Sequence, residues 1–202
     1  MKSEKKNTMD KIIIPHDVTP KKFFAELFPK QFEYNRINNP IDDLSGTEMT
    51  VQYNIQGPNG GTWNYKIKAY DEIVVAEGPN EKAILTFNLK ESDWRDIATG
   101  RNGFASREEI EKRTLKMRER REIMKNLKGK LNINLTRPEN DPVIFSVVFN
   151  KAETMELSLS MQIEDYNDMI TGKVGIPSLF IKDKVKIRGD ILFALKLSQI
   201  QL

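Results

Sequence analysis

Apolar and polar residues alternate with a period of two through much of the first half of the chain, which is typical of strands that bury one face. The alternation is clear in residues 49–55, 62–69 and 84–89, and an apolar run fills residues 73–76. Residues 57–61, Gly-Pro-Asn-Gly-Gly, have the composition of a tight turn. The pattern therefore predicts successive short strands in an antiparallel meander.

A period of three to four residues predicts helices elsewhere. Thr19 and Pro20 suit the cap and the first position of a helix. Residues 92–100 begin with Ser-Asp, either of which can cap a helix, and end at glycine. The capping box at 106–109 opens a longer helix with a narrow apolar stripe that reaches about Lys128.

The second half of the chain mixes the two patterns. We expect strands at 130–135, 143–149 and 155–161, and a short helix at 165–171. Residues 183–202 then predict a strand, a turn at Gly-Asp and a nearly all-apolar helix. Chain ends are normally polar and frayed, so this helix must be held against something. It either completes the core or forms the wall of a cavity that accepts an apolar guest.

An internal repeat emerges when the chain is shifted by 72 positions. Residues 83–100 then match 155–172 without gaps, including Asp-aromatic-x-Asp and a final Thr-Gly. Each match is followed by a lysine-led strand, at 130–135 and 184–189. We interpret this as a partial duplication with halves at about 46–136 and 143–202. The first half has the Trp63 hairpin and no apolar helix, whereas the second has the helix and no such hairpin.

Composition narrows the function classes. The chain has 202 residues, 39% hydrophobic and 30% charged, which is enough to bury a core. It has no cysteine and one histidine, His16, which excludes disulfides, thiolate zinc sites and the usual histidine-based catalytic sites. A reducing, cytoplasmic location is expected. Residues 1–18 are predicted to be a flexible leader, and residues 19–202 the folded domain.

Four aspartates are the main candidates for chemistry. Asp93, Asp96, Asp165 and Asp168 have the spacing of carboxylates that could share a cation on one helix face. The favoured interpretation is that the first of each pair caps a helix and the second interacts with its dipole. The turn at 57–61 lacks the helix and the Lys-Ser/Thr pair of a phosphate loop. No catalytic residue, metal site or cofactor is predicted, and the protein is not expected to be an enzyme.

Two features raise the question of a macromolecular partner. Tyr53, Trp63 and Tyr65 could stack on bases, but their alternating positions favour a buried sheet face. The segment Arg107–Lys130 has ten Lys or Arg and five Glu, in a chain whose net charge is +3. A solvated helix face is the default for this segment, an anionic membrane surface is the next alternative, and nucleic acid is not expected.

The order of these motifs resembles the sterol carrier protein-2 (SCP2) sterol-binding domain family. The closest segments are residues 165–172, 176–181 and 184–197, and residues 61–100 supply the earlier hairpin, strands and helix. The resemblance implies an α+β fold, in which helices cover one face of a mostly antiparallel β-sheet. It also implies an apolar tunnel between the sheet and the C-terminal helix. Because the chain has up to two copies of the unit, it could hold one cavity, two cavities or a fused sheet with none.

The resemblance further implies non-enzymatic binding or transfer of a lipid of the sterol, fatty acid or acyl-CoA type. The positions that match the tunnel wall or lie near its mouth are Ile191, Leu192, Phe193, Leu195, Ile200, Leu179, Phe180 and Met169. The alternative is a structural or protein-interaction module with the same fold and a filled core. The sequence names neither the particular lipid nor the oligomeric state.

Overall fold

An eight-stranded sheet forms the centre of the computed structural model, which describes residues 11–38, 48–69, 71–106, 124–139, 141–152 and 154–200. The strands are β1 (Glu48–Gln56), β2 (Gly61–Lys68), β3 (Glu72–Glu77), β4 (Leu85–Lys90), β5 (Gly129–Thr136), β6 (Val143–Phe149), β7 (Glu156–Gln162) and β8 (Val185–Gly189). The helices are α1 (Pro20–Lys22), the π-helical η1 (Phe23–Leu27), α2 (Phe28–Asn38), α3 (Glu91–Thr99), α6 (Ile163–Ile170), α7 (Ile176–Ile181) and α8 (Ile191–Ile200).

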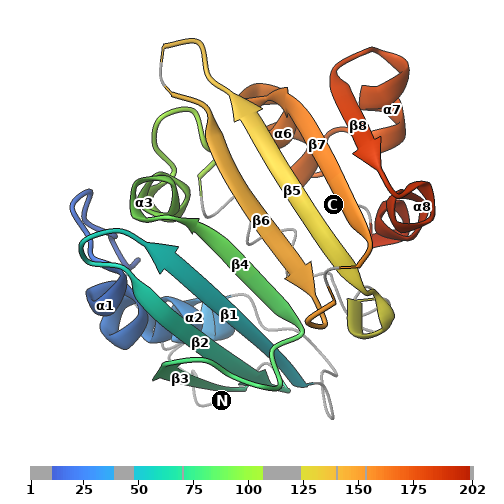
Figure 1. Cartoon of the computed structure of the whole chain (residues 1–202). Helices are drawn as coiled ribbons and strands as arrows, with labels where there is room; N and C mark the ends of the chain where they lie inside the picture. The colour runs from blue at the N-terminus through green and yellow to red at the C-terminus, as the bar shows by residue number, and fades with distance from the viewer. Residues whose placement is uncertain are drawn as a thin grey trace, which may run out of the picture.

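Helices lie on one side of this sheet. Figure 1 shows α1, α2 and α6 behind the strands, with α7 and α8 beside β8 and the front face of the sheet open. The predicted α+β class, with helices over one face of a mostly antiparallel sheet, is therefore confirmed. Alternation explains the sidedness: Val51 and Ile55 of β1 are buried toward the helices, and Gln56 ends the strand exposed.

The strand order is β3-β2-β1-β4-β6-β5-β7-β8, and two of the seven pairings are parallel. The predicted meander is right for β1, β2 and β3, which pair antiparallel in succession. It is wrong for β4, which returns across the hairpin and pairs with β1 in parallel. The turn at Pro79–Ala83 makes this return, and the amide of Ile84 donates to the carbonyl of Thr50 on the free edge of β1.

The two halves of the sheet share one pairing pattern. The strands β3-β2-β1-β4-β6 are joined by antiparallel, antiparallel, parallel and antiparallel pairs, and so are β4-β6-β5-β7-β8. The two five-strand units overlap at the β4–β6 pair. Strands β4 and β6 thus belong to both five-strand units, and this shared pattern supports the interpretation of a partial duplication.

The repeat holds for the strand and helix and fails for the strand that follows. β4 with α3 corresponds to β7 with α6, 72 residues apart, and Gly100 ends α3 in a left-handed conformation, as predicted. The equivalence of the two lysine-led strands is wrong. β8 pairs with β7, but the strand that pairs with β4 in the same sense is β6, and β5 lies beyond it.

Two of the predicted helix starts differ from those in the structure. Thr19 caps α1 as predicted, and its hydroxyl accepts a hydrogen bond from the amide of Lys22 at 3.3 Å. The prediction that Ser92, Asp93 or Asp165 would cap is wrong, because the caps are Lys90 and Gln162 in extended conformation. Most of the long helix expected after residue 106 falls outside the described residues.

Candidate functional site

The C-terminal helix α8 is apolar on two opposite sides. Phe193 and Leu197, one turn apart, are 0% and 1% exposed and face the core. Ile191, Leu192 and Leu195 face outward with 75%, 65% and 59% of their surface exposed. A helix on the surface of a protein normally has polar residues on its outward side, so the three exposed apolar side chains of α8 form a distinctive surface.

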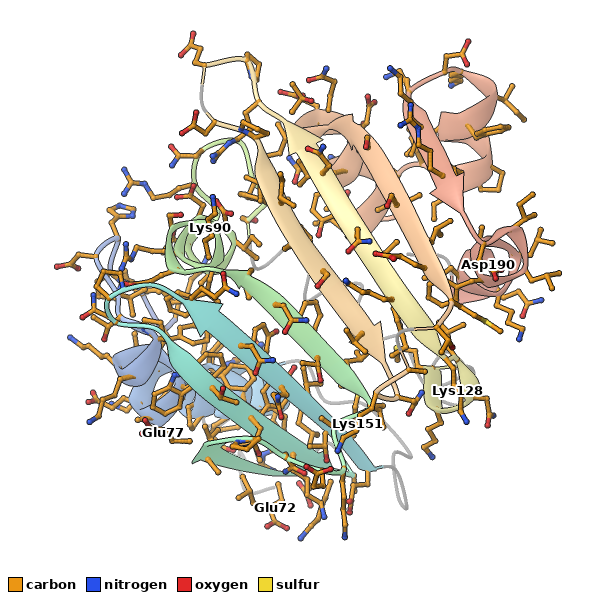
Figure 2. The ribbon with its side chains drawn as sticks, in the orientation of Figure 1. Glu72, Glu77, Lys90, Lys128, Lys151 and Asp190 are labelled. Carbon is orange, nitrogen blue, oxygen red and sulfur yellow. The ribbon has the colours of Figure 1, made fainter. Side chains whose placement is uncertain are left out.

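The start of α8 is fixed to the sheet by Asp190. Its carboxylate oxygen Oδ1 accepts a hydrogen bond from the amide of Phe193 at 2.8 Å, and its own amide donates to the carbonyl of Glu156 at 2.9 Å. Figure 2 labels Asp190 where β8 passes into α8. The turn that the sequence predicted at Gly189-Asp190 therefore positions the first turn of the helix against β7.

Phe193 is the main contact between α8 and the sheet. Its ring lies edge-on to the ring of Phe149, with the centroids 5.9 Å apart. A Cβ atom built on Gly129, at the start of β5, would lie 2.8 Å from the Phe193 ring and 2.8 Å from the carbonyl oxygen of Met155. The absence of a side chain at Gly129 therefore provides the space into which Phe193 packs.

The structure divides the eight predicted tunnel residues into two groups. Phe193, Leu179 and Met169 are buried, each at most 1% exposed. Ile191, Leu192, Leu195 and Phe180 point outward, each more than half exposed. For Ile200 the side chain lies outside what the structure describes.

Sequence reasoning missed Leu197 among the inward residues. It lies four positions after Phe193, on the same face of α8, and that spacing is the signal that could have found it. The aliphatic side chains beneath α6, α7 and α8 come from the helix-facing positions of the neighbouring strands, namely Leu131, Ile133, Leu135, Leu157, Leu159, Met161 and Val185.

Tyr166 of α6 brings a polar group into the core beside two phenylalanine rings. Its ring lies edge-on to those of Phe104 and Phe145, with centroid distances of 6.3 and 6.2 Å. Burial raises the pKa of the Tyr166 hydroxyl well above its usual value, and the nearby Tyr53 adds to the effect. The phenol is therefore neutral at physiological pH and can donate a hydrogen bond.

The helix-facing side of the N-terminal half is filled by aromatic rings. Phe24 of η1 stacks on Trp63, with the centroids 5.7 Å apart and the planes 7° from parallel. The same ring lies within 5.1 to 6.2 Å of four other rings, those of Phe23, Phe28, Tyr53 and Trp94. Together with the contact between Tyr65 and Phe28, whose ring centroids are 4.7 Å apart, these contacts confirm that Tyr53, Trp63 and Tyr65 belong to a face packed against helices and are not a surface for stacking bases.

The repeated aspartates form separate ion pairs. Asp96 accepts from Arg137 at 2.9 Å and Asp165 from Lys184 at 2.7 Å, while Asp168 lies 3.6 Å from Lys173. Burial raises the pKa of Asp93, and the charge of Arg137 opposes that rise. Across the residues whose placement is described, no group of three or more metal-ligating side chains comes together.

The open face of the sheet has a different character. Side-chain amides and hydroxyls lie in a row across it, where Asn54 donates to Asn88 at 2.8 Å and Asn88 to Ser146 at 3.2 Å. A shallow hollow of about 270 Å³ lies above this row, with Gln52 and Lys151 among its lining residues. Figure 2 labels Lys151. This polar hollow is on the side of the sheet opposite the apolar interior.

One family model matches the C-terminal part of the chain. Residues 108–201 match the model of the SCP-2 sterol transfer family. The match spans β5 to β8 and α6 to α8, and it confirms the resemblance to SCP2 for this part of the chain. No curated protein matches the chain.

Two solved structures are also similar to it. The solution structure of sterol carrier protein domain 2 of Helicoverpa armigera is 21% identical, with a TM-score of 0.35, and the match covers 46% of this chain and 85% of that one. The apo form of sterol carrier protein 2 from Yarrowia lipolytica is 16% identical, with a TM-score of 0.34, covering 47% of this chain and 82% of that one. Within the described residues, no helix has the length and apolar character needed to cross a membrane.

Proposed function

We propose that the protein binds or transfers a lipid in an apolar site between the helix-covered face of β5–β8 and the inward side of α8, without covalent chemistry. The observation that carries this proposal is the match of residues 108–201 to a sterol-transfer family. The matched half is also the half whose interior is lined by aliphatic side chains and closed by Phe193 and Leu197.

The chemistry of this region favours an elongated apolar ligand with a small polar end. Apolar pockets select by size and shape, and a few polar groups orient the guest. Tyr166, whose ring lies against those of Phe104 and Phe145, supplies one such group, and its neutral hydroxyl suits a sterol hydroxyl or a fatty acid carboxylate. We propose a sterol, fatty acid or acyl-CoA as the ligand and a cytoplasmic location, as the cysteine-free sequence predicts.

The experiment that tests this function is lipid analysis of the purified full chain. Native mass spectrometry should detect bound lipid, and a panel of fatty acids and sterols should raise the melting temperature. A ligand at a hundred times its Kd stabilises the folded state by about 2.7 kcal/mol. The proposal fails if no lipid is found and no member of the panel changes the melting temperature.

A matched pair of variants locates the site. Leu197→Trp enlarges a side chain that faces inward, and Leu195→Trp enlarges one on the same helix that faces solvent. Leu197→Trp should reduce the affinity for a fluorescent fatty acid, because the indole occupies ligand space. Leu195→Trp should leave that affinity unchanged, and equal effects of the two variants would contradict an internal site.

The second candidate is a structural or protein-interaction module with a filled core. The aromatic cluster around Phe24 favours it, because that cluster leaves the N-terminal half densely packed. If the C-terminal half is packed in the same way, Leu197→Trp should destabilise the protein by about 1–3 kcal/mol. No added lipid should then recover the loss.

A further inference from the structure

Exposed apolar side chains are concentrated at one edge of the molecule. Eight large hydrophobic residues of the described chain are exposed, and five of them belong to α7 and α8. The five are Phe180, Ile181, Ile191, Leu192 and Leu195, which we call the C-terminal patch. Figure 1 shows α7 and α8 together at the β8 edge of the sheet.

The surroundings of the patch are basic. Residues 171–202 have six Lys or Arg and two Asp, a net charge of +4, or +2 once the two aspartates of α6 that pair with Lys173 and Lys184 are counted. Lys173 and Lys184 are paired with aspartates of α6. Lys182 directly follows Ile181, Lys196 directly follows Leu195, and both are exposed. Within the described part of the chain, neither lysine has a recorded ion pair.

We propose that the C-terminal patch docks the protein on an anionic lipid surface. Apolar side chains that enter the boundary between head groups and acyl chains, flanked by lysines that meet acidic head groups, are the chemistry of peripheral membrane binding. The charge argues against a second copy of this chain as the occupant, because a two-fold contact would bring two patches of net positive charge together.

This inference goes beyond lipid binding in the interior, because it uses the outward residues of α7 and α8. Phe193 and Leu197 face the sheet, so the residues of the C-terminal patch lie on the opposite side of α8 from the proposed lipid site. Docking would bring the inward side of the same helix next to the membrane from which a lipid is taken up. The partner is thus a bilayer rich in acidic phospholipid.

Co-sedimentation with vesicles tests the apolar part of the proposal. The full chain should bind vesicles of phosphatidylcholine mixed with phosphatidylserine, and bind pure phosphatidylcholine vesicles much more weakly. The double variant Leu192→Ser/Leu195→Ser should bind the mixed vesicles about tenfold more weakly or worse. Ile144→Ser is the matched control, because Ile144 is 58% exposed on β6, away from α7 and α8.

Charge reversal tests the electrostatic part. The double variant Lys182→Glu/Lys196→Glu should lose more than about tenfold in binding, since each lysine near an anionic surface contributes about fivefold. Raising the salt concentration should likewise weaken the binding of the unmodified protein to the mixed vesicles. Lys21→Glu/Lys30→Glu is the control, because both lysines are exposed on α1 and α2 at the other end of the sheet (Figure 1).

The outcomes separate the proposal from its alternatives. Membrane docking is wrong if the patch variants and the control variants bind the mixed vesicles equally well. It is also wrong if the unmodified chain does not bind these vesicles. Sedimentation equilibrium that shows a dimer, abolished by Leu192→Ser/Leu195→Ser, would instead assign the patch to a second copy. Because fatty acid binding is measured without vesicles, loss of docking with retained fatty acid binding leaves the proposed function standing.

Discussion

The two halves of the sheet are built on one register but are filled differently on their helix-covered side. Val51, Tyr53 and Ile55 of β1 face Leu85, Phe87 and Leu89 of β4. In the other half, Leu131, Ile133 and Leu135 of β5 face Leu157, Leu159 and Met161 of β7. The same frame is therefore packed with aromatic rings from η1 and α2 in one half and with aliphatic side chains under α8 in the other.

One position shows how the difference arises. Met49 pairs with Ile67 in β1–β2, and Gly129 pairs with Phe149 at the equivalent place in β5–β6. Only the glycine leaves room for the ring of Phe193. The duplicated frame thus admits a C-terminal helix in one half, whereas the N-terminal helices fill the other. Packing, and not strand order, assigns the candidate lipid site to the C-terminal half.

The largest loss of stability is expected when a ring is removed from the aromatic cluster of the N-terminal half. Phe24→Ala removes a ring that is 1% exposed and contacts five other rings. The free energy of unfolding should fall by about 3–5 kcal/mol. Urea denaturation measures the loss, and a saturating fatty acid should stabilise Phe24→Ala only as much as it stabilises the unmodified protein.

Phe193→Ala is the counterpart in the aliphatic half, since Phe193 is 0% exposed. It should also destabilise, but a saturating fatty acid should recover part of the loss by occupying the vacated volume. The comparison between the halves is contradicted if lipid rescues Phe24→Ala as well as it rescues Phe193→Ala.

A second, smaller effect is expected at Glu91, which corresponds to the buried apolar Ile163 in the other half. Glu91 accepts from the amide and side chain of Asn59 at 2.9 and 3.2 Å and is paired with Arg95. Burial alone would raise the pKa of Glu91, but these hydrogen bonds and the charge of Arg95 hold it below 4.5. Glu91→Gln should cost about 1.5–3 kcal/mol at pH 7.

The pH dependence of that loss has a definite sign. A carboxylate whose folded pKa is lowered stabilises the fold above its ordinary pKa, and the contribution is lost as the pH falls through the folded value. The difference between Glu91→Gln and the unmodified protein should therefore shrink below pH 4.5. A difference that stays constant in acid would contradict the role of the charge.

The third prediction separates α8 from the sheet. In Gly129→Ala the new methyl group meets the Phe193 ring at a residue whose φ is +148°. We expect the free energy of unfolding to fall by about 1–2 kcal/mol. We also expect hydrogen exchange to accelerate more in α8 than in the strands of the sheet. Gly78→Ala is the matched control, because Gly78 has φ +106° with open space around it. If both variants loosen α8 equally, backbone strain and not the ring contact is responsible.

Much of the fold follows from local patterns. Each predicted strand is present because period-two alternation is a strong signal where one face is buried. The position of β4 was not predictable, since its pairing with β1 is set by contacts distant in sequence. The six-residue α7 was missed because a proline near the start of a short apolar segment gives no helical period.

The candidate site was predictable as a segment but not as a surface. The resemblance predicted a C-terminal helix against the sheet, and of the residues it named Phe193, Leu179 and Met169 lie inward. The outward orientation of Ile191, Leu192 and Leu195 was missed because the first turns of α8 are apolar on every side, although Lys196 and Gln199, one turn after Leu192 and Leu195, mark the solvent side. The fit between Phe193 and Gly129 brings together residues 64 positions apart, beyond the reach of any local pattern.

The smallest effects are expected at the equivalent aspartates Asp93 and Asp165, one in each half. Asp165→Asn weakens the hydrogen bond that Asp165 of α6 accepts from Lys184, the residue before β8, and should lower the melting temperature by about 2 °C. Asp93 behaves oppositely, because burial raises its pKa above 3.8 and its ionised form opposes folding. That penalty is present above the folded pKa and disappears as the pH falls, so Asp93→Asn should leave the melting temperature unchanged or raise it at pH 7. Thermal unfolding of both variants at pH 7 and at acid pH distinguishes the halves. Equal losses in the two variants would show that the aspartates serve one common role in the repeat.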